Sequence, residues 1–433
     1  MLNCTPKIGL GNMSLGLGSA VKALHGKHEV WPCPSTELTY WLSSLVSPNY
    51  LSKEVLPWLA IVTGVSVIGH MIRDARALWL DIVEDVRWYP SPHNSQPMKL
   101  RAISETTALV YYDLDLGLPA ESFGIPFAHV CAGVFLESLS VVAAARGYWT
   151  IEALEHSEMD FEAVDRLHLI GTVRLEPASP DAETLSAARR RLAAFRSRQT
   201  SRRPYDSRIV GDEILKGASS IAAEQGYDFR STADARMVTS LVRINQKTLF
   251  SDLRNDAVYA EIMQWLRFSK DKAAAQADGL SAETMMMPGR VLRFAMRNRS
   301  LWSFPVIGGV IRFMYLRTMR GVRQLGWLEG PFAEPSQFLE AGRTFMRVWL
   351  FFSERGVYLH PFGTVITNPA SHAEFVAEAG IDESGNRMAW MLFRFGYSSS
   401  PPIAHRRPAT SMLLGLSPEV PDGHVPTGAT PLE

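Results

Sequence analysis

The polar side chains best suited to chemistry are concentrated in one short stretch of the chain. Residues 88–98 read WYPSPHNSQPM, and the polar side chains in this stretch belong to Ser91, His93, Asn94, Ser95 and Gln96. They offer hydrogen-bond donors and acceptors in quick succession. Because prolines at positions 90, 92 and 97 restrict the backbone, fixing this row costs little conformational entropy. The stretch is either a plain surface loop or a contact for a flat ligand whose edge alternates carbonyls and ring nitrogens.

Two arginine-rich segments are candidates for binding an anion. Residues 196–208 read RSRQTSRRPYDSR and include Arg202 and Arg203, and the sequence HRRP near the C-terminus contains Arg406 and Arg407. Guanidinium groups match phosphate oxygens in a bidentate manner. Either segment alone is also compatible with a solvated surface. Taken together with the polar stretch, the arginines indicate a ligand with a planar head and a phosphate group.

The composition limits the class of protein. The chain has 433 residues and is 46% hydrophobic, so it can bury a large core. Its 44 basic and 44 acidic residues balance, which argues against general binding of nucleic acid. The three cysteines are too few and too scattered for a disulfide framework or a zinc site. We therefore expect a reducing compartment, a cytoplasmic protein and no metal.

One apolar stretch raises the question of membrane contact. From Leu56 to Ile72 the only ionisable residue is His70, and the length is at the short edge of what crosses a bilayer. Gly64 and Gly69 weaken that interpretation. We expect a buried helix, with a peripheral or anchored position at the inner face of a membrane as the alternative.

The pattern of residues predicts the elements that position these groups. Prolines 90 and 92 should end a mostly helical segment near Arg87, because they push the preceding residues into extended geometry. The other predicted elements are strands at 109–113 and 167–175, a buried helix at 127–146 and a charged helix at 182–198. Residues 1–50 are expected to form an irregular arm, and residues 398–433 a Pro-rich arm that carries the HRRP element.

Two distant segments of the chain are alike. Residues 131–148 read CAGVFLESLSVVAAARGY, and residues 340–358 read EAGRTFMRVWLFFSERGVY. In both, Arg-Gly follows an early Ala-Gly at the same spacing, with an apolar helical pattern between them. Small residues allow close packing of helices, and Arg-Gly suits a helix C-terminus. The likeness is either coincidence or the trace of a duplication, with halves at residues 51–180 and 181–397 that pack like a dimer within one chain.

The motifs together resemble those of the nitroreductase family. The sequence PSPHNSQP at 90–97 resembles the family signature Pro-Ser-x-x-Asn-x-Gln-Pro, which touches the flavin of FMN, although Met98 stands where an aromatic residue is usual. The RRP element at 406–408 resembles the family's basic element for the FMN phosphate. TSRRPY at 200–205 and DGL at 278–280 resemble the long single-chain, Acg-like subgroup, in which two halves mimic the usual homodimer. That subgroup's acidic-x-x-Arg feature is absent after the first strand.

The resemblance covers about residues 85–410 and implies an α+β, nitroreductase-like fold. A central, mainly antiparallel sheet would be flanked by helices, with two pseudo-symmetric halves in one monomeric chain. In such proteins the flavin supplies the chemistry, so no acid–base residue is assigned. The implied FMN-binding residues are Ser91, His93, Asn94 and Gln96 at the ring, and Arg202 or Arg203 with Arg406 or Arg407 at the phosphate or the pyrimidine side.

The resemblance further implies an FMN-dependent oxidoreductase. NAD(P)H or another donor would reduce the flavin, and the acceptor would be a flat, apolar small molecule such as a quinone, nitroaromatic or enone. The apolar residues 301–316 would form a lid or a pocket wall. The alternative is a protein that stores or sequesters FMN with little turnover.

Overall fold

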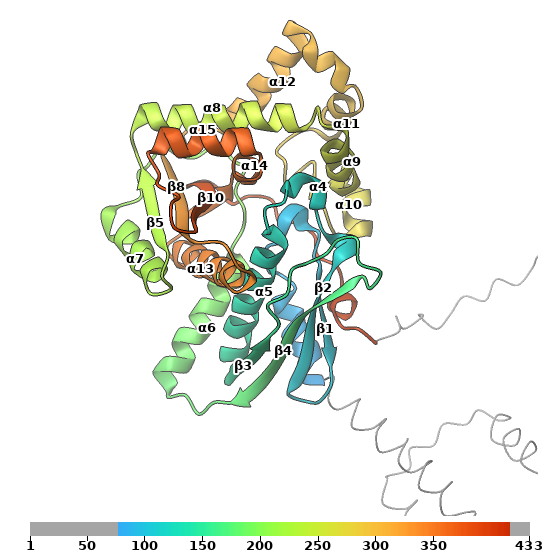
Figure 1. The fold of residues 1–433 in the computed structure, drawn as a ribbon, viewed down its shortest axis with the longest axis vertical. Helices are drawn as coiled ribbons and strands as arrows, with labels where there is room; N and C mark the ends of the chain where they lie inside the picture. Colours follow the sequence, from blue (N-terminus) through green and yellow to red (C-terminus); the bar gives the residue numbers. More distant parts are fainter. Residues whose placement is uncertain (1–76, 416–433) are drawn as a thin grey trace, which may run out of the picture. The chain divides into compact units, whose positions relative to one another are not determined.

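The computed structural model describes residues 77–415, which form an α+β structure of two four-stranded antiparallel sheets flanked by helices (Figure 1). The predicted fold class, with its antiparallel sheets and two similar halves, is confirmed. The predictions for residues 1–50, for the stretch from Leu56 to Ile72 and for residues 416–433 lie outside the described residues.

The first sheet follows a helix at residues 77–86 and has the strand order β1-β2-β4-β3. Its strands are β1 (Met98–Ala102), β2 (Thr107–Asp113), β3 (Tyr148–Leu154) and β4 (Leu167–Pro177). Helix α5 (Phe127–Ala144) connects β2 to β3 and is buried along most of its length, as its apolar composition predicts.

The second sheet repeats this arrangement, with the order β5-β8-β10-β9. Its strands are β5 (Asp228–Thr232), β8 (Gln324–Pro331), β9 (Tyr358–Pro361) and β10 (Arg387–Gly396). Helix α13 (Pro335–Glu354) connects β8 to β9, as α5 connects β2 to β3. The two halves thus share both the order of elements along the chain and the order of strands in space.

Even an irregularity in the strand pairing is repeated. In the first sheet, neighbouring residues of β2 pair with Gly171 and Leu169, so that Ile170 is left out of the register. In the second sheet, Ala389 and Met391 pair with neighbouring residues of β8, so that Trp390 is left out. Each bulge lies at the fourth residue of its strand, which is strong support for pseudo-symmetric halves.

The two like segments identified in the sequence cross each other at their glycines. A Cβ atom on Gly133 would lie 1.9 Å from the carbonyl oxygen of Leu339, and one on Gly342 would lie 2.0 Å from the carbonyl oxygen of Val130. Each glycine therefore packs on the backbone three residues before the other glycine. Such reciprocity is typical of a two-fold interface, here formed within one chain.

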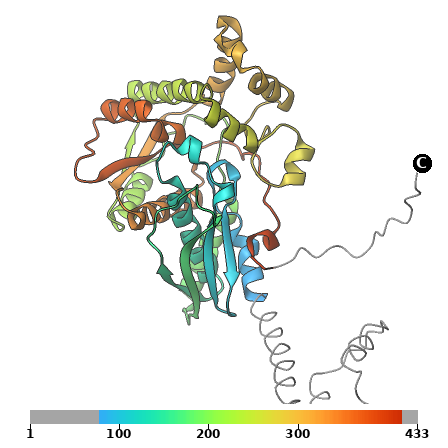
Figure 2. The same ribbon diagram turned by 45° about the vertical axis from the view of Figure 1, so that its right-hand side comes forward.

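The halves differ most between their first two strands. Residues 103–106 join β1 to β2, whereas residues 233–323 lie between β5 and β8 and form a helical insertion. Its elements are α8 (Ala235–Asp252), α9 (Asp256–Trp265), β6 (Leu266–Arg267), α10 (Lys270–Gln276), β7 (Leu280–Ser281), α11 (Gly289–Arg297), η3 (Arg299–Ser303) and α12 (Pro305–Thr318). Figures 1 and 2 show that α11 and α12 project away from both sheets.

The remaining elements connect and cover the halves. They are η1 (Pro92–Asn94), η2 (Leu114–Leu116), α4 (Pro119–Ser122), α6 (Ala182–Ser197), α7 (Asp212–Ala223), α14 (Gly363–Thr367), α15 (Pro369–Ala379) and η4 (Ala409–Met412). Helix α6 packs on both α5 and α13. The C-terminal segment returns to the first sheet, where the amide of Leu414 donates to the carbonyl of Leu100 at 2.7 Å.

Among the described residues, one helix is apolar and long enough to cross a membrane, and it is α5. In the folded protein 78% of this helix is buried, which is typical of the core helix of a globular fold.

Candidate functional site

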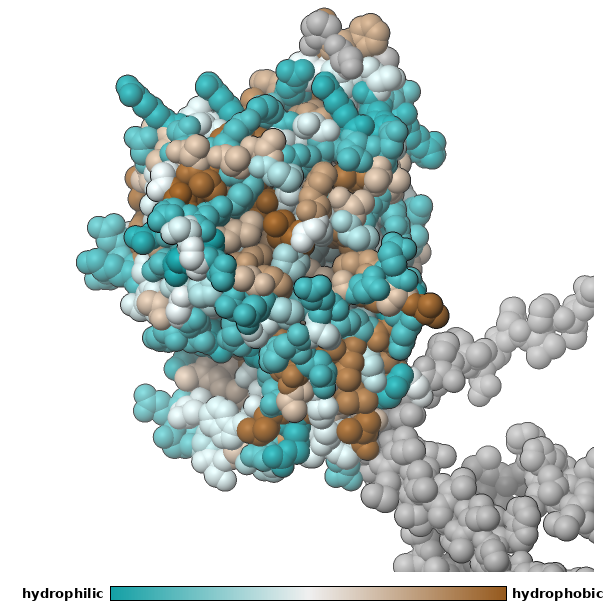
Figure 3. Space-filling model, viewed as in Figure 1, coloured by the Kyte–Doolittle hydropathy of each residue, from teal (hydrophilic) through white to brown (hydrophobic). Residues whose placement is uncertain are grey.

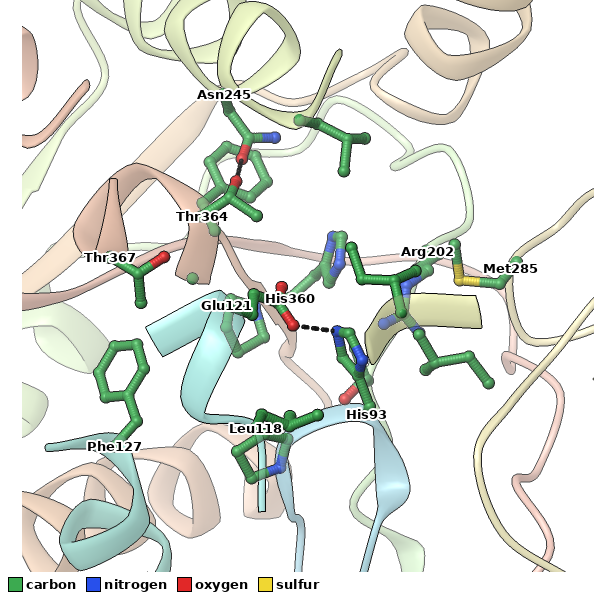
Figure 4. Close-up of a pocket in the computed structure, with 18 of the residues that line it drawn as sticks. His93, Leu118, Glu121, Phe127, Arg202, Asn245, Met285, His360, Thr364 and Thr367 are labelled. Carbon is green, nitrogen blue, oxygen red and sulfur yellow. Dashed lines mark hydrogen bonds and ion pairs between the residues drawn. The ribbon is translucent and has the colours of Figure 1, made fainter. Parts of the chain in front are cut away.

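A largely apolar cavity of about 390 Å³ is the main candidate site. Its wall is formed by residues 90–93, by α5 and α13 from the two halves, by the end of β9 and by the helical insertion. Few polar side chains line it, and those labelled in Figure 4 are His93, Glu121, Arg202, Asn245, His360, Thr364 and Thr367. A cavity of this size with few polar groups suits a drug-sized or cofactor-sized ligand.

The polar stretch after residue 89 is folded into a tight and strained loop. His93, Asn94 and Gln96 have φ values of 49°, 57° and 56°, in the left-handed region that residues other than glycine seldom adopt. The hydroxyl of Ser91 accepts a hydrogen bond from the amide of Gln96 at 3.0 Å and closes the loop. Because such backbone strain persists only where the surroundings impose it, it marks a candidate functional site.

Within this loop, Asn94 and Gln96 bind protein groups that come from far along the chain. The Asn94 amide nitrogen donates to the carbonyls of Gly279 at 3.2 Å and His405 at 3.0 Å. The Gln96 amide nitrogen donates to the carbonyl of Ala277 at 3.0 Å, while its oxygen accepts from the amide of Arg407 at 2.9 Å. The fold thus brings three sequence motifs, PSPHNSQP, DGL and HRRP, into one network.

Asp278 lies at the centre of that network and pairs with two arginines. Its carboxylate accepts from Arg267 at 2.9 Å and 2.5 Å and also from the guanidinium of Arg407. Arg407 further donates to the carbonyl of Ser95 at 2.9 Å. Arg407 therefore already has a carboxylate partner, which it shares with Arg267.

Arg198, which is buried, and Arg406, which is partly buried, have in contrast no carboxylate partner among residues 77–415. The Arg198 guanidinium lies over the ring of Trp349 at 4.3 Å, and Arg406 lies over the ring of Trp88 at 5.5 Å. The Nε atoms of both arginines are buried and find no hydrogen-bond partner in the part of the chain that the structure describes. Burial, together with the charge of Arg406, lowers the pKa of Arg198 to about 9. Arg198 thus lies beside the cavity wall at Trp349, and together with Arg406 it is a candidate site for an anion.

A second positive group lines the cavity itself. Arg202 faces the space that His93 and His360 also face (Figure 4), and burial together with the charge of Arg394 lowers its pKa to about 10. Burial and the two arginines hold the pKa of His360 well below its usual range, so this imidazole is neutral at pH 7. Its Nδ1 atom is buried without a partner.

The pKa of His93 is shifted in the opposite direction to that of His360. Its Nε2 atom lies 2.9 Å from a carboxylate oxygen of Glu121, which comes from the short helix α4 (Figure 4). Burial lowers the pKa of His93, but the charge and the hydrogen bond of Glu121 raise it by more, so the net direction is upward. The cavity therefore contains one imidazole that favours protonation and one that resists it.

The predicted site residues fall into four groups in the structure. Ser91, His93 and Arg202 line the cavity. Asn94, Gln96 and Arg407 meet in the network around Asp278, and Arg406 lies with Arg198. Arg203 does not line the cavity, and it donates to the carbonyl of Ser400 at 2.8 Å.

Sequence reasoning did not single out Arg198, Glu121 or His360 as functional residues. Arg198 belongs to the arginine-rich segment 196–208, so its residue type and position were visible, but its burial was not. Glu121 and His360 lie in no motif, and no signal in the sequence could have identified them.

No family model and no curated protein matches the sequence. Solved structures are similar to it at low identity. A nitroreductase with bound FMN from Bacteroides fragilis is 11% identical, with 50% of this chain and 92% of that chain covered and a TM-score of 0.29. The FMN-dependent nitroreductase NfnB from Mycobacterium smegmatis, in complex with NADPH, is 13% identical, with 49% and 89% covered and a TM-score of 0.29. A BluB-like flavoprotein from Clostridium difficile is 13% identical, with 52% and 98% covered and a TM-score of 0.31.

The chain is similar to flavin-bound nitroreductases. Each of these likenesses covers about half of the chain. TM-scores near 0.3 do not place the chain in that family, so its function must be argued from its own residues.

Proposed function

We propose that this chain is an FMN-dependent oxidoreductase that passes electrons from NAD(P)H or another donor to a flat, apolar acceptor. The observation that carries the proposal is a large apolar cavity with the buried Arg198 against its wall at Trp349 and the partly buried Arg406 nearby, neither paired with a carboxylate among the described residues. A ligand with an anionic end and a flat apolar body complements this arrangement, and the sequence motifs independently indicate such a ligand.

The residues present fit FMN when its two ends are considered separately. The phosphate would be held by Arg198 and Arg406, whose free Nε donors and mutual repulsion favour an anion between them. The ring system would lie in the cavity, where several polar atoms of the lining have no protein partner. These atoms are His93 Nδ1, His360 Nδ1, Trp349 Nε1 and Thr367 Oγ1. Asn94 Oδ1 is also unpartnered and remains a candidate contact for the ring edge.

When bound, FMN would supply the electron transfer. The chain's own residues bind and orient it, exclude water and hold protons. His93, paired with Glu121, holds a proton on an imidazole that lines the cavity. Arg202 adds positive charge on the same side and so stabilises negative charge on a bound ligand.

The apolar lining supports an acceptor of low polarity. Ile311 and Met314 from α12 and Met285 and Met287 from the preceding loop form part of the wall. Methionine side chains adapt to ligands of different shape. Flat quinones, nitroaromatics and enones fit this description. The predicted role of residues 301–316 as a pocket wall is supported by Trp302, Ile311 and Met314.

We further propose one flavin per chain. The polar loop at residues 87–97 joins the first helix to β1, but the equivalent connection between α7 and β5 is only residues 224–227 and cannot form such a loop. The halves at residues 51–180 and 181–397 would therefore share a single site in a monomer that mimics a dimer. We place this protein in the cytoplasm, which suits the free, buried Cys131.

The test is the visible absorption spectrum of the purified full-length protein, with any released chromophore identified by chromatography. Bound FMN at about one per chain, bleached by NADH or NADPH, is the expected result. Flavin that binds but is not bleached by any donor would favour the storage alternative. A colourless protein that also fails to bind added FMN would refute the proposal.

A further inference from the structure

The projecting part of the helical insertion has an unusual composition. Residues 284–323 contain eight arginines and no lysine, aspartate or glutamate. Seven of these arginines are exposed and make no ion pair with any described residue; they are Arg290, Arg293, Arg297, Arg312, Arg317, Arg320 and Arg323. A surface of this kind is strongly cationic although the whole chain is neutral.

The same segment exposes large apolar side chains. Val306, Val310 and Phe313 are 78%, 54% and 68% exposed, and their spacing places them on one face of α12. Phe294 on α11 and Phe304 at the start of α12 are also more than half exposed. Figure 3 shows apolar residues at the tip of the projection, with hydrophilic residues over much of the neighbouring surface. We call the exposed side of α11 and α12 the tip surface.

The opposite side of these helices faces the cavity. Ile311, Met314 and Tyr315 line the cavity from α12, and Leu292 and Met296 line it from α11. Each helix is therefore apolar inside, where the cavity is, and mixed apolar and cationic outside. A helix needs only one apolar face to pack on its own protein, so the apolar residues on the outer face of α12 are not required by the fold.

We propose that the tip surface docks on an anionic lipid membrane. Exposed Phe and Val side chains would enter the interface between headgroups and acyl chains, and the surrounding arginines would bind the anionic headgroups. Charge complementarity favours a membrane over a second copy of this chain, because two copies would bring the same arginines together. A docked tip surface sets the apolar cavity directly behind the membrane interface, where a lipophilic molecule would enter.

The proposal is tested by flotation of the full-length protein with vesicles. Vesicles of phosphatidylcholine with about a third of phosphatidylglycerol are compared with vesicles of phosphatidylcholine alone. We expect binding to the anionic vesicles, weaker binding to the neutral ones, and a loss of binding as salt is raised. Because this binding needs no flavin, the test stands whether or not the protein is an oxidoreductase.

Two sets of variants identify the surface responsible. Replacing Arg293, Arg312 and Arg317 by glutamine should weaken the partition into anionic vesicles by about fivefold per arginine. Replacing Phe304 and Phe313 by serine should weaken it at least about tenfold, also at high salt. These side chains are exposed, so the variants should keep the circular dichroism spectrum and the unfolding midpoint of the native protein.

Control variants make the same kinds of change, arginine to glutamine and an exposed apolar residue to serine, elsewhere on the surface. Arg189 is exposed on α6, and Val164 is 99% exposed in the loop before β4, so Arg189→Gln and Val164→Ser should leave binding unchanged. No vesicle binding by the native protein would overturn the proposal. So would full binding by both tip variants, since another part of the chain would then be responsible. Self-association that the phenylalanine variant abolishes, without any binding to vesicles, would show that the occupant is a second copy instead.

Discussion

Replacing Arg198 by methionine should have opposite effects on the flavin-free protein and on its affinity for FMN. Methionine keeps the apolar part of the side chain but removes the charge. Arg198 is 7% exposed, has no carboxylate partner among the described residues and repels Arg406. Burying its charge therefore destabilises the protein when no anion is bound, but the same charge favours binding of an anion.

The size of the first effect can be estimated from the structure. A pKa lowered from 12.5 to about 9 corresponds to roughly 4–5 kcal/mol lost in burying the charge. The cation–π contact with Trp349 and the hydrogen bond to the Trp88 carbonyl return about 3–4 kcal/mol of this. Removing the side chain should thus stabilise the flavin-free protein by about 1 kcal/mol at pH 7. Urea unfolding of flavin-free protein measures this difference.

The second effect, on the affinity for FMN, depends only on the phosphate group of FMN. A charge-assisted hydrogen bond contributes about 1.5–3 kcal/mol, so Arg198→Met should weaken FMN binding about 10- to 100-fold. Riboflavin lacks the phosphate, and its affinity should change by less than about threefold. Quenching of flavin fluorescence measures both dissociation constants, and Arg189→Met on the surface of α6 is the matched control.

The outcome that refutes this reasoning is specific. If the native protein binds riboflavin as tightly as FMN, no phosphate site exists. If it prefers FMN but Arg198→Met keeps that preference, the phosphate is bound elsewhere, and the network around Asp278 with Arg407 becomes the candidate.

Three further predictions follow from the structure. Glu121→Gln should lower the pKa of His93. The native pair stabilises the fold below pH 6.5, and this effect is lost as pH rises through the raised pKa of His93. The variant should therefore lose more stability at pH 6 than at pH 9, and equal losses would contradict the pairing. Burial raises the pKa of Asp252 to about 6, so the stability of the native protein should fall as pH rises from 3.8 through 6. In thermal or urea unfolding, Asp252→Asn should increase the free energy of unfolding by about 1–2 kcal/mol at pH 8 but change it little at pH 4. Gly342→Ala should destabilise the protein by about 1–3 kcal/mol or more in urea unfolding, because its Cβ meets a backbone carbonyl, whereas Gly363→Ala, with open space around it, should cost far less.

Much of the fold could be predicted from local patterns. The predicted helices at 127–146 and 182–198 correspond to Phe127–Ala144 and Ala182–Ser197, and the predicted strands at 109–113 and 167–175 lie within Thr107–Asp113 and Leu167–Pro177. These elements depend on apolar periodicity and on breaking residues, which are local properties. The repeated Ala-Gly segments also indicated the central crossing, because only glycine allows two helix backbones to approach so closely.

Only part of the candidate site could be predicted from local sequence patterns. The proline-fenced loop identified Ser91 and His93, whose side chains line the cavity. The sequence contains many arginines, however, and says nothing about which of them meet a carboxylate. Arg407 meets Asp278, Arg203 lies away from the cavity, and Arg198 meets no carboxylate among the described residues.

The sequence by itself determined the elements and predicted a duplication and the chemical character of the ligand, since each inference depends on residue types at short or repeated spacing. Tertiary structure alone decided which charges are balanced, which histidine holds a proton and which face of the insertion meets solvent. The physical reason is that these properties depend on burial and on neighbours that come from distant parts of the chain: His93 meets Glu121 from another element, and Arg198 meets Arg406 from the C-terminal segment.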